Sequence, residues 1–185
     1  MTEVQTRGRT LFNGWRLAGW GALAALLCLP AVAMQLTGEV DWTASDFVFA
    51  AVLLTALGTG VEIALRVGRS ARHKVAIALA ALGAFLTVWI NMAVGIIGSE
   101  DEPTNLAFLA MVGMAIVASL LVSFRPERMR WIMAALAAGQ FAVGIAAATW
   151  TMPGHAVEWG ALGFFATIWG ASAACFHSAH LPAAM

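Results

Sequence analysis

The stretch that decides the fold runs from Val75 to Ile97 and reads VAIALAALGAFLTVWINMAVGII. It contains no charged side chain, whereas Arg72 and Lys74 precede it and the acidic run Glu100 to Glu102 follows it. An α-helix needs roughly 20 apolar residues to cross the hydrocarbon core of a bilayer. The stretch therefore predicts a transmembrane helix with a basic end and an acidic end.

Five further apolar runs of similar length lie on either side of this stretch. Together they predict six helices, at residues 17–36, 46–65, 75–97, 106–124, 131–150 and 157–176. The connections between the runs are shorter than about ten residues, which leaves no room for a separate soluble domain. We therefore predict an all-α polytopic membrane bundle, a single domain over residues 1–185 whose six helices form three up-and-down hairpins.

The basic residues give this bundle a predicted orientation. All ten fall in three segments that alternate with loops free of Lys and Arg: Arg7, Arg9 and Arg16; Arg66, Arg69, Arg72 and Lys74; and Arg125, Arg128 and Arg130. Short loops rich in Lys and Arg stay on the cytoplasmic side of membranes. We therefore expect both termini to be cytoplasmic, the other three loops to be outside, and the membrane to be a bacterial inner membrane.

Composition supports a membrane protein and excludes one class of partner. Hydrophobic residues make up 61% of the chain and charged residues 11%, whereas soluble domains have about 45 to 50% apolar residues. The basic residues are scattered anchors rather than a single surface stripe, which argues against nucleic acid. The lipid bilayer is the expected partner, and a homo-oligomer or a larger membrane complex remains open.

The first apolar run also has one feature of a signal peptide, because it ends in Ala31-Val32-Ala33, an A-x-A pattern. Its core is close to 20 residues, longer than the usual 7 to 15 of a signal peptide, which favours a retained helix. Cys28 lies mid-way along this run and Cys175 near the inner end of the last one. Because their depths differ, no disulfide is expected.

Glu62 is the one carboxylate in the interior of a predicted helix, and ionisable groups there are candidates for function. It precedes Arg66 by four residues, the favourable order for an ion pair along a helix. A structural ion pair is therefore the favoured interpretation, with a proton or cation relay as the alternative.

Amide side chains are the second group of candidates. Asn91 and Gln35 lie at membrane depth, and Asn105 belongs to the outer turn after the 75–97 run. With Glu62, these three are our ligand-binding candidates for a solute below that turn. An interhelical hydrogen bond is the ordinary role of such amides in membranes.

The outer face offers a candidate site for a divalent cation. Four carboxylates and one imidazole fall in two short loops predicted on the same side, namely Glu100, Asp101, Glu102, His155 and Glu158. Oxygen and imidazole nitrogen are metal ligands, and histidine can also change charge between about pH 5 and 8. As the alternative, acids at helix starts compensate helix dipoles without any ligand.

Signatures of catalysis and of haem are missing from the sequence. It contains no P-loop, G-x-S-x-G, H-E-x-x-H or C-x-x-C motif. His177 and His180 lie in the C-terminal tail, and His73 lies among basic loop residues. No two histidines are expected to face each other at membrane depth, which argues against haem. The sequence therefore favours a protein without covalent chemistry.

One segment resembles a known family. Residues 89–106, WINMAVGIIGSEDEPTNL, are similar to a motif of an uncharacterised family of small bacterial multi-pass membrane proteins, mainly over Asn91 to Leu106. The resemblance implies no activity, but it marks the turn after the 75–97 run as the characteristic site of that family.

Two functions remain open at this stage. The leading one is a transport-like or solute- or ion-responsive membrane protein that uses the outer turn and the cavity beneath it, around Asn91 and Gln35. The alternative is a non-catalytic accessory or assembly subunit that packs against a larger membrane complex. A polar groove leading from the outer turn into the bundle would favour the first, and an unpacked face of small residues would favour the second.

Overall fold

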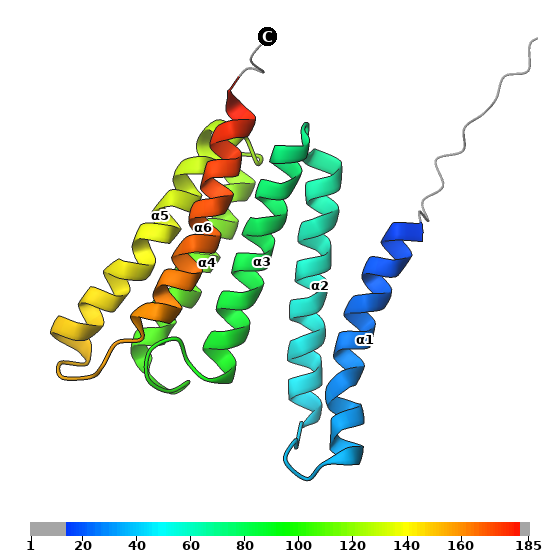
Figure 1. Ribbon diagram of the computed structural model, residues 1–185, viewed down its shortest axis with the longest axis vertical. Helices are drawn as coiled ribbons and strands as arrows, with labels where there is room; N and C mark the ends of the chain where they lie inside the picture. The colour runs from blue at the N-terminus through cyan, green and yellow to red at the C-terminus, as the bar shows by residue number, and fades with distance from the viewer. Residues whose placement is uncertain (1–13, 182–185) are drawn as a thin grey trace, which may run out of the picture. The chain divides into compact units, whose positions relative to one another are not determined.

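The structure, a computed structural model, describes residues 14–181 (Figure 1). Within this range every regular element is helical, and there is no β-strand. Six of the described helices are long and apolar enough to cross a membrane. The all-α class and the six apolar helices predicted from the sequence are therefore confirmed for residues 14–181. The chain divides into two compact units after Gly58.

The first unit contains α1 (Gly14–Leu36) and most of α2 (Ala44–Val67). A Cβ atom on Gly58 would lie 2.7 Å from the Trp20 ring, so glycine is what allows these two helices to pack so closely. The start of α2 is fixed by its carboxylate, since the Thr43 N–H donates to Asp46 Oδ2 over 2.7 Å. Asp46 therefore caps α2, as its spacing from Thr43 predicts.

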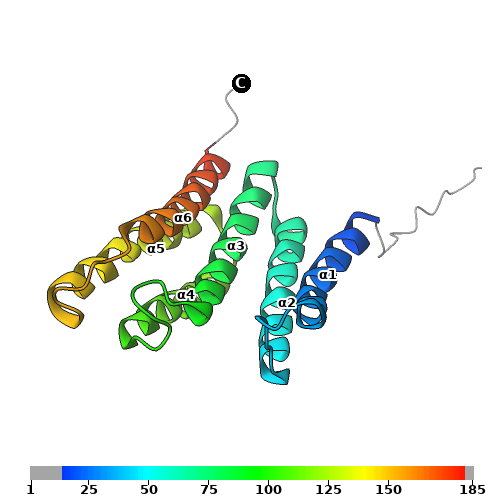
Figure 2. The same cartoon turned by 60° about the horizontal axis from the view of Figure 1, so that its bottom comes forward.

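The second unit is a closed four-helix bundle. It consists of α3 (Ala71–Ala93), α4 (Leu106–Leu121), α5 (Pro126–Ala146) and α6 (Trp159–His180). The helix α3 packs against α4, α4 against α5, α5 against α6, and α6 again against α3 (Figure 1, Figure 2). A 3₁₀ turn, Pro103–Asn105, precedes α4, and a π-helical turn, Ala147–Thr151, follows α5.

The interior of this bundle is filled by aromatic side chains and tied by one long-range polar contact. Trp169 and Phe165 of α6 and Phe108 of α4 are almost fully buried. A Cβ on Gly83 would lie 3.2 Å from the Trp169 ring, so a small residue of α3 accommodates the indole. Ser172 Oγ donates to the carbonyl oxygen of Ala76 over 2.8 Å. Close packing and this hydrogen bond join α3 to α6 in an environment where lipid removes the usual hydrophobic drive.

The outer surface of the bundle is apolar. Met114, Leu120, Ile145 and Phe164 are each more than half exposed on three different helices. Soluble monomers rarely expose large contiguous apolar patches, whereas a bilayer solvates such side chains. The surface is therefore consistent with a multi-pass membrane protein.

Helix ends differ from the prediction in ways that local chemistry explains. The predicted helix at 75–97 begins earlier and stops at Ala93, while the predicted helix at 131–150 begins at Pro126. Proline fits the first helical position because no N–H is needed there. A search for apolar runs misses a polar first turn, so the predicted helix begins too late. The predicted helix at 157–176 continues to His180, so polar ends lengthen both helices.

The end of α4 carries backbone strain. Ser123 has φ of 52° and Phe124 has φ of 55°, the left-handed conformation that glycine normally adopts. The Phe124 N–H donates to the Ser119 carbonyl and the Ser123 N–H to the Leu120 carbonyl. This pattern is a Schellman motif in which serine occupies the usual glycine position.

We predict that Ser123→Gly stabilises the fold by about 1 kcal/mol, because glycine avoids most of the cost of a left-handed conformation. The measurement is unfolding of the purified protein in detergent. Ser178→Gly, which lies inside α6 in ordinary helical conformation, is the control and should destabilise the fold. Destabilisation by both changes would contradict the strain assigned to Ser123.

Candidate functional site at the acidic end of the bundle

The acidic end of the bundle is formed by residues 94–105, between α3 and α4, and residues 147–158, between α5 and α6. The chain leaves α3 at Gly95, which has φ of +78°. A Cβ at this position would lie 2.5 Å from the Ser99 carbonyl oxygen. Both the left-handed backbone and the close approach require glycine. The helix therefore ends at Ala93 although the apolar sequence continues to Ile97, which is the main correction to the predicted boundaries.

Asn105 holds the turn that results. Its Oδ1 accepts the N–H groups of Ile96 and Ile97 over 3.2 and 3.0 Å. Its Nδ2 donates to the carbonyl oxygens of Ile97 and Ser99 over 3.0 and 2.7 Å. The side chain is 2% exposed, and all four of its hydrogen-bonding positions are used. Asn105, a predicted ligand-binding residue, therefore has a structural role in fixing the turn.

Asn91 extends the same network from α3. Its Nδ2 donates to the carbonyl oxygen of Asn105 over 3.2 Å, so the interhelical hydrogen bond expected as the ordinary role is present. Its Oδ1 is buried and has no partner among residues 14–181. Half of this amide therefore serves the fold, and one buried acceptor remains open below the turn.

The other predicted amide, Gln35, lies in the other compact unit of the chain. It is exposed near the end of α1, in the first unit. Gln140 of α5 is a further buried amide, and it is 1% exposed. Its Oε1 and the indole Nε1 of Trp169 likewise lack a partner among the described residues. The bundle interior thus contains several unsatisfied polar atoms, which are costly when buried.

Two contacts join the α3–α4 turn to the α5–α6 loop. The Gly98 N–H donates to Glu158 Oε1 over 3.3 Å, and Thr104 Oγ1 donates to Thr151 Oγ1 over 2.9 Å. Thr151 belongs to the π-helical turn, a feature that occurs often at functional sites. The two loops that carry the predicted metal ligands therefore meet.

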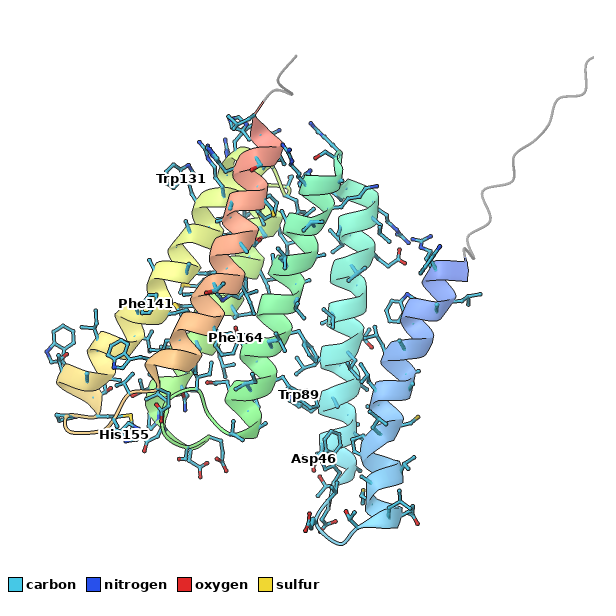
Figure 3. All side chains as sticks on the ribbon, viewed as in Figure 1. Asp46, Trp89, Trp131, Phe141, His155 and Phe164 are labelled. Atoms are coloured by element: carbon cyan, nitrogen blue, oxygen red, sulfur yellow. The ribbon has the colours of Figure 1, made fainter. Side chains whose placement is uncertain are left out.

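Glu158 also approaches the imidazole of its own loop. His155 Nε2 lies 3.4 Å from Glu158 Oε1, and the two side chains are 36% and 42% exposed. His155 lies in the loop joining α5 to α6, at the opposite end of the bundle from Trp131 (Figure 3). One carboxylate oxygen therefore faces both a backbone N–H of one loop and an imidazole of the other.

The remaining predicted metal ligands are less closely placed. Glu102 is half-buried, and its Cγ would lie 3.1 Å from a Cβ on Gly98, while His155 Cε1 would lie 3.8 Å from the same point. Glu100 and Asp101 are exposed. Across residues 14–181, no group of three or more His, Cys, Asp and Glu side chains is arranged to hold a metal ion. The structure thus brings His155, Glu158 and the Glu102 stem together without assembling the five residues around one point.

Glu62 forms the ion pair expected from its spacing. Arg66 Nε lies 3.5 Å from Glu62 Oε2, four residues apart on α2. The carboxylate side chain is 16% exposed and the guanidinium side chain 70% exposed. The expected ion pair is therefore present, and the guanidinium side chain is the more exposed of its two members.

His73 has a structural role that its place among basic loop residues does not predict. The Arg69 N–H donates to His73 Nδ1 over 3.3 Å, so Nε2 bears the proton and donates to the Phe124 carbonyl oxygen over 3.1 Å. The ring also packs edge-on against Phe176 at 5.7 Å. Ser70, whose Oγ accepts the His73 N–H, was the available signal, because a helix cap there puts His73 in the first turn of α3.

Comparisons with known proteins add no relative to this description, since no family model, curated protein or solved structure matches the chain.

We predict that Asn105→Leu destabilises the protein by about 3 kcal/mol or more, because it orphans four backbone groups in a buried turn. Asn91→Leu is the matched control, since it removes one hydrogen bond and one unpaired acceptor and should cost about 1 kcal/mol or less. Unfolding in detergent measures both values. Equal losses in the two variants would show that Asn105 does not fix the turn.

Proposed function

We propose that the protein is a solute- or ion-responsive membrane protein with transport-like action, in which protons control the closure of the acidic end. The observation that carries this proposal is the position of Glu158 Oε1, which accepts the Gly98 N–H and lies 3.4 Å from His155 Nε2. A change of charge on His155 therefore acts directly on the contact that joins the two loops.

The direction of the response follows from the charges. Histidine side chains gain a positive charge as the pH falls through the range of about 5 to 8, and they lose this charge as the pH rises. A protonated His155 attracts Glu158 and weakens the repulsion between Glu158 and the nearby Glu102. The closure is therefore tighter at mildly acidic pH and looser at alkaline pH.

A divalent cation could act on the same groups through carboxylate oxygens. The described side chains do not form a three-ligand cluster, so protons are the better supported signal. The residue below the closure that is available to a polar solute is Asn91, whose buried Oδ1 has no partner among residues 14–181. This acceptor supports a polar rather than an apolar solute.

Membrane orientation belongs to the same proposal. We place the basic end, which includes Arg69, Arg72 and Arg125, in the cytoplasm of a bacterium, and the acidic end outside its inner membrane. The proton-responsive closure would then face a compartment whose pH follows the surroundings.

A second candidate function is an accessory or assembly subunit of a larger membrane complex. It is favoured by glycines on the outside of the bundle, since a Cβ on Gly113, Gly160, Gly163 or Gly170 would have no atom within 4 Å. Such open backbone surfaces allow close helix contacts in lipid. A His155→Ala variant that functions like the wild type would favour the accessory subunit over the proton-responsive protein.

We predict that the hydrogen-exchange protection of residues 95–105, corrected for intrinsic exchange, is about two- to fivefold higher near pH 5.5 than near pH 8. This range corresponds to the energy of a partly exposed ion pair. His155→Ala should abolish the difference, because it removes the imidazole that lies 3.4 Å from Glu158 Oε1.

His180→Ala is the matched control for this experiment. His180 Nδ1 also lies near a carboxylate, 4.0 Å from Glu127 Oε1, but at the other end of the bundle. The control should keep the pH response of residues 95–105. The same response in wild type and His155→Ala would rule out the proposed closure mechanism.

We also predict the orientation of each loop in cells. Cysteine labels or reporter fusions at Gly38, Glu102 and Gly154 should be accessible from outside, while Arg69, Glu127 and the C-terminus should be accessible only from the cytoplasm. The physical reason is the retention of Lys- and Arg-rich short loops on the cytoplasmic side. A C-terminus outside the cell would contradict the proposed orientation.

A further inference from the structure

The basic end of the four-helix bundle contains a pocket that plays no part in the proposed closure. Its volume is about 310 Å³, near the lower limit of typical small-ligand sites. It lies between the start of α3 and the α4–α5 turn. The residues relevant to binding are Arg69, His73, Ser123, Arg125, Pro126 and Glu127.

The charges of this pocket favour an anion. Arg69 and Arg125 contribute two guanidinium groups, and Glu127 contributes one carboxylate. Among residues 14–181, neither Arg69 nor Arg125 takes part in an ion pair, and Glu127 Oε1 lies 4.0 Å from His180 Nδ1. The two guanidinium groups are therefore available to a ligand, while the single carboxylate has a partner outside the pocket.

The backbone of the pocket adds the positive end of one helix dipole. The N-cap of α5 is Arg125, which makes no side-chain capping bond, and Pro126 follows it. Pro126 has no N–H, and the Arg125 and Arg128 N–H groups donate to the carbonyl oxygens of Val122 and Arg125. This helix start therefore contributes the partial positive charge of its dipole rather than a set of free donors. The Phe124 carbonyl oxygen, which would repel an anion, already accepts a hydrogen bond from His73 Nε2.

The turn that forms one wall of the pocket is strained. Ser123 and Phe124 both adopt positive φ, and His73 holds this conformation through the Phe124 carbonyl. Backbone strain of this kind is concentrated at binding sites, where it positions groups in advance. The cavity, its two guanidinium groups and the positive end of α5 thus point to the same ligand chemistry.

We propose that this pocket binds a phosphate group. Arginine binds phosphate through two parallel hydrogen bonds, and the partial positive charge at the start of α5 also favours an anion. Two sources supply this chemistry at the end of apolar membrane-spanning helices, namely the headgroup of an anionic phospholipid and free inorganic phosphate. The site is independent of the acidic-end closure, so either proposal can fail without the other.

The test uses the full-length protein purified in a neutral detergent. Phosphatidylglycerol, phosphatidylcholine or inorganic phosphate is titrated in, and binding is followed by native mass spectrometry and by the midpoint of thermal unfolding. The pocket variant carries Arg69→Gln and Arg125→Gln. The control variant carries Arg72→Gln and Arg128→Gln, which remove the same charge from the same end but do not line the pocket.

We expect the pocket variant to lose affinity by about tenfold or more for phosphatidylglycerol, inorganic phosphate or both, because charge-assisted bonds are lost. The control should change by less than about threefold, as expected for screened surface charge. A higher midpoint of thermal unfolding with phosphatidylglycerol, and no change with inorganic phosphate, would assign the site to a lipid headgroup. A gain with inorganic phosphate that phosphatidylglycerol does not exceed would assign it to the free anion.

Folding of the variants is checked by helix content and by the single variant Arg125→Gln, which removes only one exposed side chain. Equal losses in the pocket and control variants would overturn the proposal, since binding would then reflect total charge. Equal binding of phosphatidylcholine and phosphatidylglycerol, with no effect of inorganic phosphate, would overturn it as well.

Discussion

The acidic end of this bundle depends on the hydrogen bonds of one buried amide. A chain that leaves a helix near the membrane core exposes N–H and C=O groups for which lipid offers no partner. Asn105 satisfies four of these groups from Ile96, Ile97 and Ser99. The turn can therefore bury Ile96 and Ile97 almost completely, although neither belongs to a helix. Without the amide, the turn would have to move toward water or refold as helix.

The position of the turn determines which groups can meet across the acidic end. Once Ile97 is fixed, the next residue, Gly98, directs its N–H to Glu158, a partner 60 positions later in the chain. His155 reaches the same carboxylate oxygen from its own loop. A rigid turn on one side and a titratable pair on the other allow a change of charge to alter a defined contact, which a mobile turn would absorb without effect.

Hydropathy was sufficient to predict the helices, because a helix spans the hydrocarbon core by virtue of a long run of apolar residues, whichever helices it packs against. The Glu62–Arg66 pair was equally predictable, since its four-residue spacing along one helix determines the geometry. The end of α3 was not, because the apolar run through Gly95 to Ile97 reads as helix until the Asn105 hydrogen bonds are known. The role of His73 was missed for the same reason. Its contact with Phe124 spans 51 positions, so the residues next to His73 in the sequence do not predict it.

The two histidines that contact these turns have different capacities to respond to protons. His73 is 3% exposed, and its Nδ1 already accepts the Arg69 N–H while Nε2 donates to Phe124. A second proton would turn Nδ1 from an acceptor into a donor that faces the Arg69 N–H. This ring therefore fixes a turn and is poorly suited to sensing protons. His155 is about one-third exposed and faces a carboxylate, so an added proton gains a partner there. The response to pH that we propose is therefore better placed at the acidic end, while the basic end keeps a fixed geometry that suits the proposed anion site.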